Sequence, residues 1–224
     1  MKLILFGATG MIGQGALREA LRDPEVEAVL AIGRSITGQH HPKLREIRHP
    51  DLQDLSAIAA ELSGYDACLF CLGITSVGLS EAQYAHVTHD LTLSIARTLA
   101  QHNPGMSFVY VSAAGSDASE RGRVMWARVR GRTENALFRL PFRRVYAVRP
   151  AGIRPRDGIR SRTGYVDALY RVLGPALPLL QRALPAYVTD TRELSRAMLR
   201  LAKSGGMVRV IEARNIPGLG REGS

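Results

Sequence analysis

Three glycines near the N-terminus have a spacing that can hold a phosphate. Residues 7–13 have the sequence GATGMIG, a G-x-x-G-x-x-G pattern, directly after a short apolar run. The apolar run predicts a strand and the residues after it predict a helix, so the glycines would form the turn between them. The first N–H groups of a helix are free and carry a partial positive charge, which attracts phosphate. The segment therefore predicts a dinucleotide pyrophosphate site.

Each glycine has a predicted role in this turn. Gly7 permits a sharp exit from the strand, Gly10 lets the pyrophosphate approach the backbone, and Gly13 lets the helix pack closely on the sheet. A turn with a structural role alone is the alternative, but its place between a strand and a helix favours a ligand site. The predicted cofactor contacts in the turn are Gly7, Thr9, Gly10, Met11, Ile12 and Gly13.

The elements that must position this turn alternate along the chain. Apolar runs predict strands at 2–6, 28–32, 44–48, 67–72, 107–112 and 144–149. Helical patterns lie between them at 11–22, 55–62, 80–101 and 124–140. Strands that are apolar throughout and alternate with helices predict a parallel sheet covered on both faces. The expected fold class is α/β, a doubly wound parallel sheet of the Rossmann type with a small C-terminal lobe.

The chain is expected to form a single domain over residues 1–224. Residues 1–153 would be the cofactor half, 154–204 a small substrate lobe, and 205–224 the last strand and a tail. Within these parts we expect a polar loop at 154–162, a helical hairpin at 165–184, a helix at 191–203 capped by Thr189 or Asp190, and a strand at 208–212. The tail from Pro217 is expected to be frayed.

The end of the second predicted strand bears on the choice of dinucleotide. NAD sites usually place a carboxylate there to hold the ribose hydroxyls. This chain instead has Arg34, whose guanidinium suits a 2′-phosphate, followed by Ser35, which could add a hydrogen bond. The alternative is that Arg34 is a solvent-facing arginine in an arginine-rich chain. The sequence thus favours NADP as the cofactor, with NAD less favoured.

Two other strand ends complete the predicted cofactor site. Asp51 and Leu52 follow the third strand, where they could meet the adenine edge. Gly73 follows the fourth strand, where a missing side chain would let the backbone pass the nicotinamide ribose. The predicted contacts at this strand end are Cys71, Leu72 and Gly73.

By its motifs the chain resembles the short-chain dehydrogenase/reductase superfamily, and most of all its atypical branch, the Tat-interacting-protein-like and NmrA-like NAD(P)-binding proteins. The matching pieces are GATGMIG at 7–13, Gly33-Arg34, Asp51-Leu52, CLGIT at 71–75, VSAAG at 111–115 and RPAG at 149–152. The resemblance spans residues 1 to about 153. It implies an NADP(H)-binding fold with reductase or epimerase chemistry.

The chain departs from these relatives at the residues that carry the chemistry. Active relatives have Tyr-x-x-x-Lys on the helix after the fifth strand, where the tyrosine donates a proton and the lysine lowers its pKa and binds ribose. Here Trp126 stands in place of the tyrosine and Arg130 in place of the lysine. An indole N–H does not titrate usefully, whereas Arg130 could still bind ribose or phosphate. Ser112 is the remaining candidate of this set, and in some relatives the catalytic serine stands a residue or two later, at the position of Ala113 or Ala114. The Ser112 hydroxyl could orient a substrate carbonyl, or the residue could simply end a strand beside the cofactor.

The catalytic candidates are therefore Ser112 and Arg130, with two further hypotheses for the missing proton donor: Tyr165 and Tyr187 in the C-terminal lobe. Two functions remain open. One is an NADP-dependent reductase or epimerase-like enzyme, and the other is an NADP(H)-sensing or scaffolding protein without turnover. The partner would be a small-molecule substrate or none. The protein would be a monomer or a homodimer.

Composition excludes several other classes. A formal net charge of +10 could indicate nucleic-acid binding, but the excess is almost entirely arginine with few interleaved aromatic residues, so we expect no specific nucleic acid. No apolar run is long enough to span a bilayer, and no signal peptide or membrane partner is expected.

Cys68 and Cys71 fit a buried strand better than a metal or redox pair, and His86 and His89 fit a surface face, so no metal is expected. Cysteines that form no disulfide indicate a reducing compartment, so we expect a cytoplasmic protein.

Overall fold

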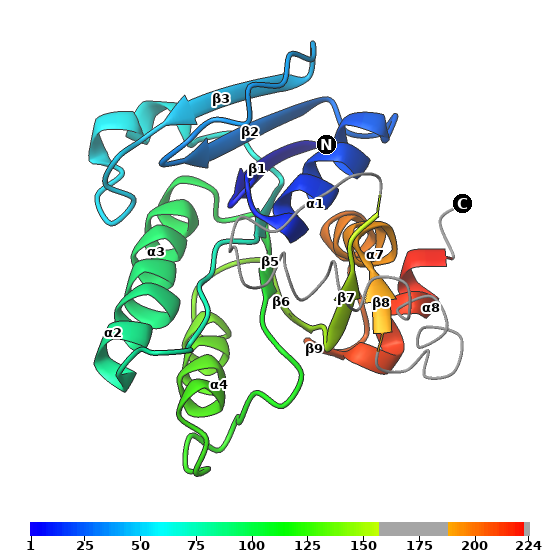
Figure 1. Ribbon diagram of the computed structural model, residues 1–224. Helices are drawn as coiled ribbons and strands as arrows, with labels where there is room; N and C mark the ends of the chain where they lie inside the picture. The colour runs from blue at the N-terminus through cyan, green and yellow to red at the C-terminus, as the bar shows by residue number, and fades with distance from the viewer. Residues whose placement is uncertain (157–187, 222–224) are drawn as a thin grey trace.

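A parallel sheet of seven strands, in the order β3-β2-β1-β4-β5-β6-β9, forms the centre of the protein (Figure 1). The computed structural model describes residues 1–156 and 188–221. The strands of the sheet are β1 (Lys2–Phe6), β2 (Ala28–Gly33), β3 (Leu44–Arg48), β4 (Ala67–Phe70), β5 (Ser107–Val111), β6 (Arg144–Arg149) and β9 (Val210–Glu212). This strand order confirms the predicted doubly wound α/β fold.

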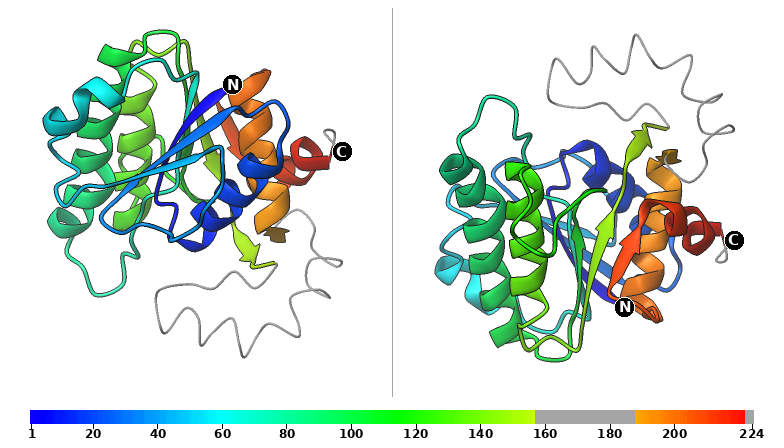
Figure 2. Two further views of the ribbon diagram at one scale, coloured as in Figure 1. Left: turned by 90° about the horizontal axis from the view of Figure 1, so that it is seen from above. Right: turned by 90° about the horizontal axis from the view of Figure 1, so that it is seen from below.

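Helices cover both faces of the sheet, as the two views of Figure 2 show. One layer holds α2, α3 and α4, and the other holds α1, α7 and α8. The helices are α1 (Met11–Arg22), the 3₁₀ helix η1 (Ser56–Glu61), α2 (Glu81–Ala85), the π-helical segment η2 (His86–Leu91), α3 (Thr92–His102), α4 (Met125–Leu137), α7 (Thr191–Lys203), the 3₁₀ turn η3 (Ala213–Asn215) and α8 (Ile216–Arg221).

The apolar strands supply both halves of the core. In β1, Leu3 and Leu5 face the layer of α1 and α7, while Ile4 and Phe6 face the layer of α3 and α4. Side chains alternate between the faces of a strand, so a strand covered on both sides must be apolar at every position. Rings of Phe6, Phe70 and Phe108 pack in a row across three strands, with centroids 5.7 Å apart at each step.

Two predicted elements take other forms in the structure. The helix expected at 55–62 is the 3₁₀ helix η1. Its backbone forms i to i+3 hydrogen bonds, and the segment is flanked by buried Leu55 and Leu62. The helix expected at 80–101 begins where predicted, with Ser80 and Gln83 forming a capping box, but it contains the π-helical segment η2. There, the Thr88 carbonyl oxygen accepts a 3.4 Å hydrogen bond from the Thr133 hydroxyl of α4.

The C-terminal part differs more from the prediction. Residues 152–154 form β7 (Gly152–Arg154), which pairs in parallel with β8 (Val188–Asp190). The loop expected at 154–162 therefore begins inside a strand, and the hairpin expected at 165–184 lies outside the described residues. Asp190 caps α7 through the N–H groups of Arg192 and Glu193, as one of the two predicted caps.

The prediction of a frayed tail from Pro217 is wrong for the described residues. Residues 216–221 form α8, in which Ile216 is fully buried and Leu219 packs against the core. A Cβ atom at Gly220 would overlap the backbone of Glu193, so α8 lies directly on α7. Among the described helices, none is long and apolar enough to cross a membrane.

The loop of residues 117–122 packs closely on α4. The carbonyl oxygen of Asp117 lies so near Gly131 that a Cβ atom there would overlap it. Asp117 also orders the loop itself, because its carboxylate accepts hydrogen bonds from the Ser119 and Gly122 N–H groups at 3.0 and 2.6 Å. The loop can reach α4 only because position 131 has no side chain.

We predict that Gly131→Ala lowers the free energy of unfolding by about 1–3 kcal/mol, because the added methyl group must displace backbone. Urea unfolding measures the change. Gly218→Ala is the matched control, since a Cβ atom on this exposed helical glycine meets nothing within 4 Å and should stabilise by about 0.5–1 kcal/mol. Equal effects at the two glycines would contradict the packing described for the loop.

Candidate functional site

A cleft of about 820 Å³ opens at the carboxyl ends of β1, β2, β4 and β5. It spans the point where the strand order reverses between β1 and β4, where doubly wound folds bind ligands. Its volume suits a small-molecule or cofactor site. Its lining residues are Gly7, Ala8, Thr9, Gly10, Met11, Ile12, Ala31, Ile32, Gly33, Arg34, Ser35, Glu46, Leu52, Cys71, Leu72, Gly73, Ile74, Thr75, Val111, Ser112 and Arg130.

The glycine turn has the predicted geometry. Gly7 has a φ of +81°, which favours glycine, and a Cβ atom there would lie 2.7 Å from the carbonyl carbon of Cys71. A Cβ atom at Gly13 would overlap the backbone of Gly7, so Gly13 has a packing role and does not line the cleft. Gly10 is the N-cap of α1, with no side-chain cap and no acidic residue in the first turn. The N-terminal amides of α1 are therefore not satisfied by a side-chain cap, which suits an anion.

The end of the cleft at which we expected adenosine contains most of the residues predicted for it. Arg34 and Ser35 are exposed and line the cleft, and Leu52 is buried in its wall. Within residues 1–156 and 188–221, the Arg34 side chain makes no hydrogen bond or ion pair. Asp51 lies outside the cleft lining, and its carboxylate accepts a 2.9 Å hydrogen bond from the Gln53 N–H instead.

Glu46 is a cleft residue that the sequence reasoning missed. It lies on β3 opposite Ala31 of β2, so an acid reaches this end of the cleft from the neighbouring strand. Its carboxylate accepts hydrogen bonds from the N–H groups of Thr37 at 2.7 Å and Gly38 at 3.3 Å. The prediction considered an acid at the end of β2, whereas the register of β3 against β2 brings Glu46 to the cleft.

Arg130 provides the positive charge at the other end of the cleft. Its Nε donates to the Tyr84 hydroxyl oxygen at 2.8 Å, and its Nη1 donates to the Val111 carbonyl oxygen at 3.4 Å. Its Nη2 faces Gly73, 4.0 Å from where a Cβ atom would stand. Burial opposes the charge on Arg130, but nearby Tyr110 and Tyr84 outweigh it, so the pKa of the guanidinium is raised. Arg130 is thus a fixed, permanently charged donor that lines the cleft.

The residues near Arg130 offer no titratable proton donor to the cleft. Trp126 is not part of the lining; it packs beside Tyr84 and Val129, near Gly115. Burial raises the pKa of Tyr110 to about 12. Among the described residues no tyrosine lines the cleft. Tyr165 and Tyr187 lie outside the described residues.

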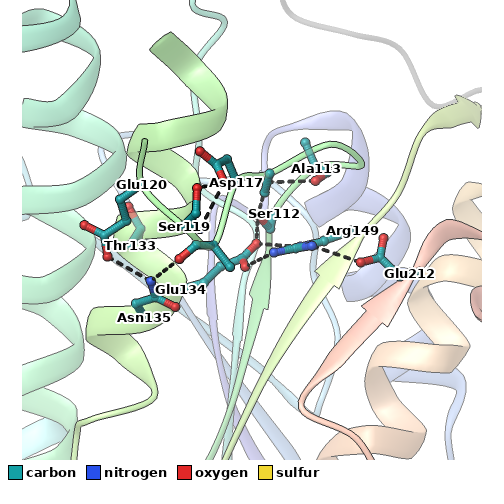
Figure 3. A network of polar contacts seen from close by, with 12 residues as sticks. Ser112, Ala113, Asp117, Ser119, Glu120, Thr133, Glu134, Asn135, Arg149 and Glu212 are labelled. Atoms are coloured by element: carbon teal, nitrogen blue, oxygen red, sulfur yellow. Dashed lines mark hydrogen bonds and ion pairs between the residues drawn. The ribbon is translucent and has the colours of Figure 1, made fainter. Parts of the chain in front are cut away.

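Ser112 directly follows β5, which ends at Val111 and not at 112 as predicted, and belongs to a buried polar network beside the cleft (Figure 3). Its hydroxyl donates to Glu134 Oε1 on α4 at 2.5 Å. Arg149 of β6 holds the same carboxylate through Nε to Oε1 at 3.0 Å and Nη2 to Oε2 at 2.5 Å, and pairs with Glu212 of β9 at 2.9 Å. The hydrogen bonds with Glu134 raise the pKa of Arg149 more than burial lowers it. Sequence reasoning found Ser112 but missed Glu134, which comes from another element.

The two cysteines are free thiols. Cys68 is buried in β4, whereas Cys71 follows the strand, which ends at Phe70 and not at 72 as predicted, and lines the cleft. Burial raises the pKa of Cys68 and raises that of Cys71 to about 12. Both thiols are therefore protonated near neutral pH, which fits a packing role better than redox chemistry.

Comparisons with known proteins bear on this site. A sequence model of the NAD dependent epimerase/dehydratase family matches residues 3–122. Leucinostatins biosynthesis cluster protein T of Purpureocillium lilacinum is 29% identical over 92% of this chain and 86% of its own length. Protein fmp52-2, mitochondrial, of Aspergillus terreus is 25% identical over 97% of this chain and 96% of its own.

Solved structures share the fold. The Bordetella bronchiseptica enzyme WbmF in complex with NAD⁺ has a TM-score of 0.67 and 13% identity, over 98% of this chain and 76% of that one. A short chain dehydrogenase from Burkholderia cenocepacia in complex with NADP has a TM-score of 0.62 and 16% identity, over 94% of this chain and 86% of that one. With the family match, these neighbours support a nicotinamide dinucleotide as cofactor, of either kind.

The prediction of a cytoplasmic location is contradicted by the relatives. Several of them, including the Aspergillus terreus protein, are named mitochondrial. Free cysteines indicate a reducing compartment but do not say which one, and the prediction rested on them.

The buried pair of Glu134 and Arg149 gives a prediction about stability. Glu134 is 1% exposed, so Arg149→Met would leave its charge buried without its main partner. We expect a loss of about 3–5 kcal/mol in the free energy of unfolding, measured in guanidinium chloride. In the control Arg45→Met, which removes the exposed pair with Glu61, the loss should stay below about 1 kcal/mol. A loss at Arg149 no larger than at Arg45 would contradict a buried network.

Proposed function

The chain belongs to the NAD dependent epimerase/dehydratase family, and from this premise we propose that it binds NADP(H) in the cleft as a reductase- or epimerase-like oxidoreductase with an altered Tyr-x-x-x-Lys site. The observation that carries the proposal is the glycine turn, where the uncapped N-terminus of α1 opens into the cleft. In the proposed pose the pyrophosphate lies at Gly10, the adenosine points to Arg34 and Leu52, and the nicotinamide points to Gly73 and Arg130.

The preference for NADP over NAD rests on charge at the adenosine end. Arg34 and Ser35 supply a cation and a hydroxyl that suit a 2′-phosphate. The nearby carboxylate of Glu46 is turned to the N–H groups of Thr37 and Gly38, so part of its charge is already balanced. The arginine is therefore the dominant charge for a ligand at this end.

The chemistry would be shared between the cofactor and Arg130. The nicotinamide supplies or accepts the hydride when it is bound. Arg130 cannot release a proton, but its charge would stabilise negative charge that develops on a substrate oxygen. Trp126 lies outside the lining and the Ser112 hydroxyl donates its hydrogen bond to Glu134, so a proton would come from water.

A second function, NADP(H) sensing or scaffolding without turnover, is favoured by one observation. The indole of Trp126 stands where active relatives have the proton-donating tyrosine, and it packs away from the cleft. The cofactor site would be the same in both functions, and only turnover separates them.

The cofactor assignment predicts that Arg34→Ala weakens NADPH binding about tenfold, through loss of a charged contact to the 2′-phosphate, and leaves NADH binding unchanged. Fluorescence titration of both cofactors measures this. Arg48→Ala is the control, because Arg48 ends β3 and does not line the cleft. If NADH binds as tightly as NADPH and Arg34→Ala changes neither, the assignment to NADP is wrong.

The altered site predicts slow turnover. With a panel of aldehydes, ketones and quinones, we expect weak NADPH oxidation that falls in Arg130→Met. In the double variant Trp126→Tyr, Arg130→Lys, a tyrosine that turns its hydroxyl toward the cleft would restore a general acid and should raise the rate about a hundredfold. Trp126→Phe, Arg130→Lys is the control without a hydroxyl. Unchanged rates in the double variant would contradict the altered-site proposal, and no turnover in any form would favour the sensing function.

A further inference from the structure

The hydroxyl of Ser112 already uses its one proton in a hydrogen bond within the protein. A serine hydroxyl carries one proton and two lone pairs, and an ionised carboxylate only accepts. The bond of 2.5 Å between Ser112 Oγ and Glu134 Oε1 therefore uses the single Ser112 proton. Ser112 has no proton left for a ligand in the cleft.

Arg149 keeps Glu134 in its accepting form. The guanidinium binds both carboxylate oxygens, in the paired geometry that suits an ionised carboxylate. Figure 3 shows Arg149 between Glu134 and Glu212, so the cation is itself held from two sides. Because Glu134 is 1% exposed, its charge depends on this partner and the carboxylate cannot rotate away into water.

The neighbouring Ser116 leaves at least one lone pair of the Ser112 oxygen free to accept a hydrogen bond from a ligand. The two hydroxyl oxygens are 3.0 Å apart. The single Ser116 proton can go either to Ser112 or to the Ala113 carbonyl oxygen, which lies 2.8 Å away. Even when Ser116 donates to Ser112, one of the two Ser112 lone pairs remains unused.

We propose that Glu134, held by Arg149, makes Ser112 an obligate hydrogen-bond acceptor, and that the donor it receives in the cleft is the carboxamide N–H₂ group of the nicotinamide. The inference rests on the proposed cofactor binding and assigns Ser112 to cofactor recognition, not to a substrate carbonyl. Glu134 is then a positioning residue. A substrate oxygen is left to Arg130, which can only donate.

The test pairs a protein variant with a matched cofactor analogue. In the 3-acetylpyridine analogue of NADP⁺ a methyl group replaces the amide nitrogen, so the donor is lost while the carbonyl stays. Ser112→Ala should weaken NADP⁺ binding about fivefold and leave binding of the analogue unchanged. Calorimetric titration of both ligands to both proteins gives the four affinities. Ser116→Ala is the control, since Ser116 does not line the cleft, and should keep the wild-type preference.

Glu134→Gln tests the positioning role. Its readout is the ratio of the two ligand affinities, which a loss of stability alone would not change. A glutamine can offer its N–H₂ group to Ser112, which frees the serine proton for the cleft. The preference for NADP⁺ over the analogue should then fall in this variant. Should Glu134→Gln not fold, the Ser112→Ala comparison still decides the proposal.

The outcomes separate this inference from the function on which it rests. If wild-type protein binds NADP⁺ but Ser112→Ala weakens both ligands equally or neither, the acceptor role of Ser112 is overturned and cofactor binding stands. If wild-type protein binds neither ligand, the proposed function itself is wrong.

Discussion

The close approach of backbone to backbone at the turn between β1 and α1 is the constraint on which the site depends. Gly13 packs on the carbonyl of Gly7, and Gly7 packs on the carbonyl of Cys71, with no space for a side chain at either glycine. This packing sets the start of α1 directly at the reversal of strand order between β1 and β4. The uncapped amides of α1 then face the cleft, a geometry that suits an anion.

A second constraint acts at the opposite end of the cleft. Glu134 and Arg149 join α4, β6 and β9 through one buried ion pair and its neighbour Glu212. The same carboxylate accepts the hydrogen bond of the Ser112 hydroxyl, so a structural ion pair also orients a side chain that lines the cleft. The glycine turn, Arg34 and Arg130 line one cleft, whereas Trp126 lies outside its lining.

Much of the fold could be predicted because its strands are buried on both faces. Burial leaves a continuous apolar run in the sequence, and β1 and β6 begin and end where those runs predict. The 3₁₀ helix η1 and the π-helical segment η2 could not be predicted, because tertiary packing decides which carbonyl each N–H meets. The helix α8 likewise depends on its contact with α7, which no local sequence pattern indicates.

The candidate site shows the same division. Gly7, Arg34 and Arg130 could be found because each stands at a fixed spacing from a strand or motif. Glu46 and Glu134 were missed because each reaches the site from a neighbouring element, and only the register of β3 and the packing of α4 bring them there. Asp51 has the right spacing but is turned to the Gln53 N–H.

A crystal structure of the protein with NADP⁺ tests the central claim most directly. The account predicts the pyrophosphate on the N–H groups at the start of α1, the 2′-phosphate beside Arg34, and the nicotinamide between Gly73 and Ser112. A dinucleotide bound away from the glycine turn, or with its pyrophosphate out of reach of the α1 amides, would contradict it.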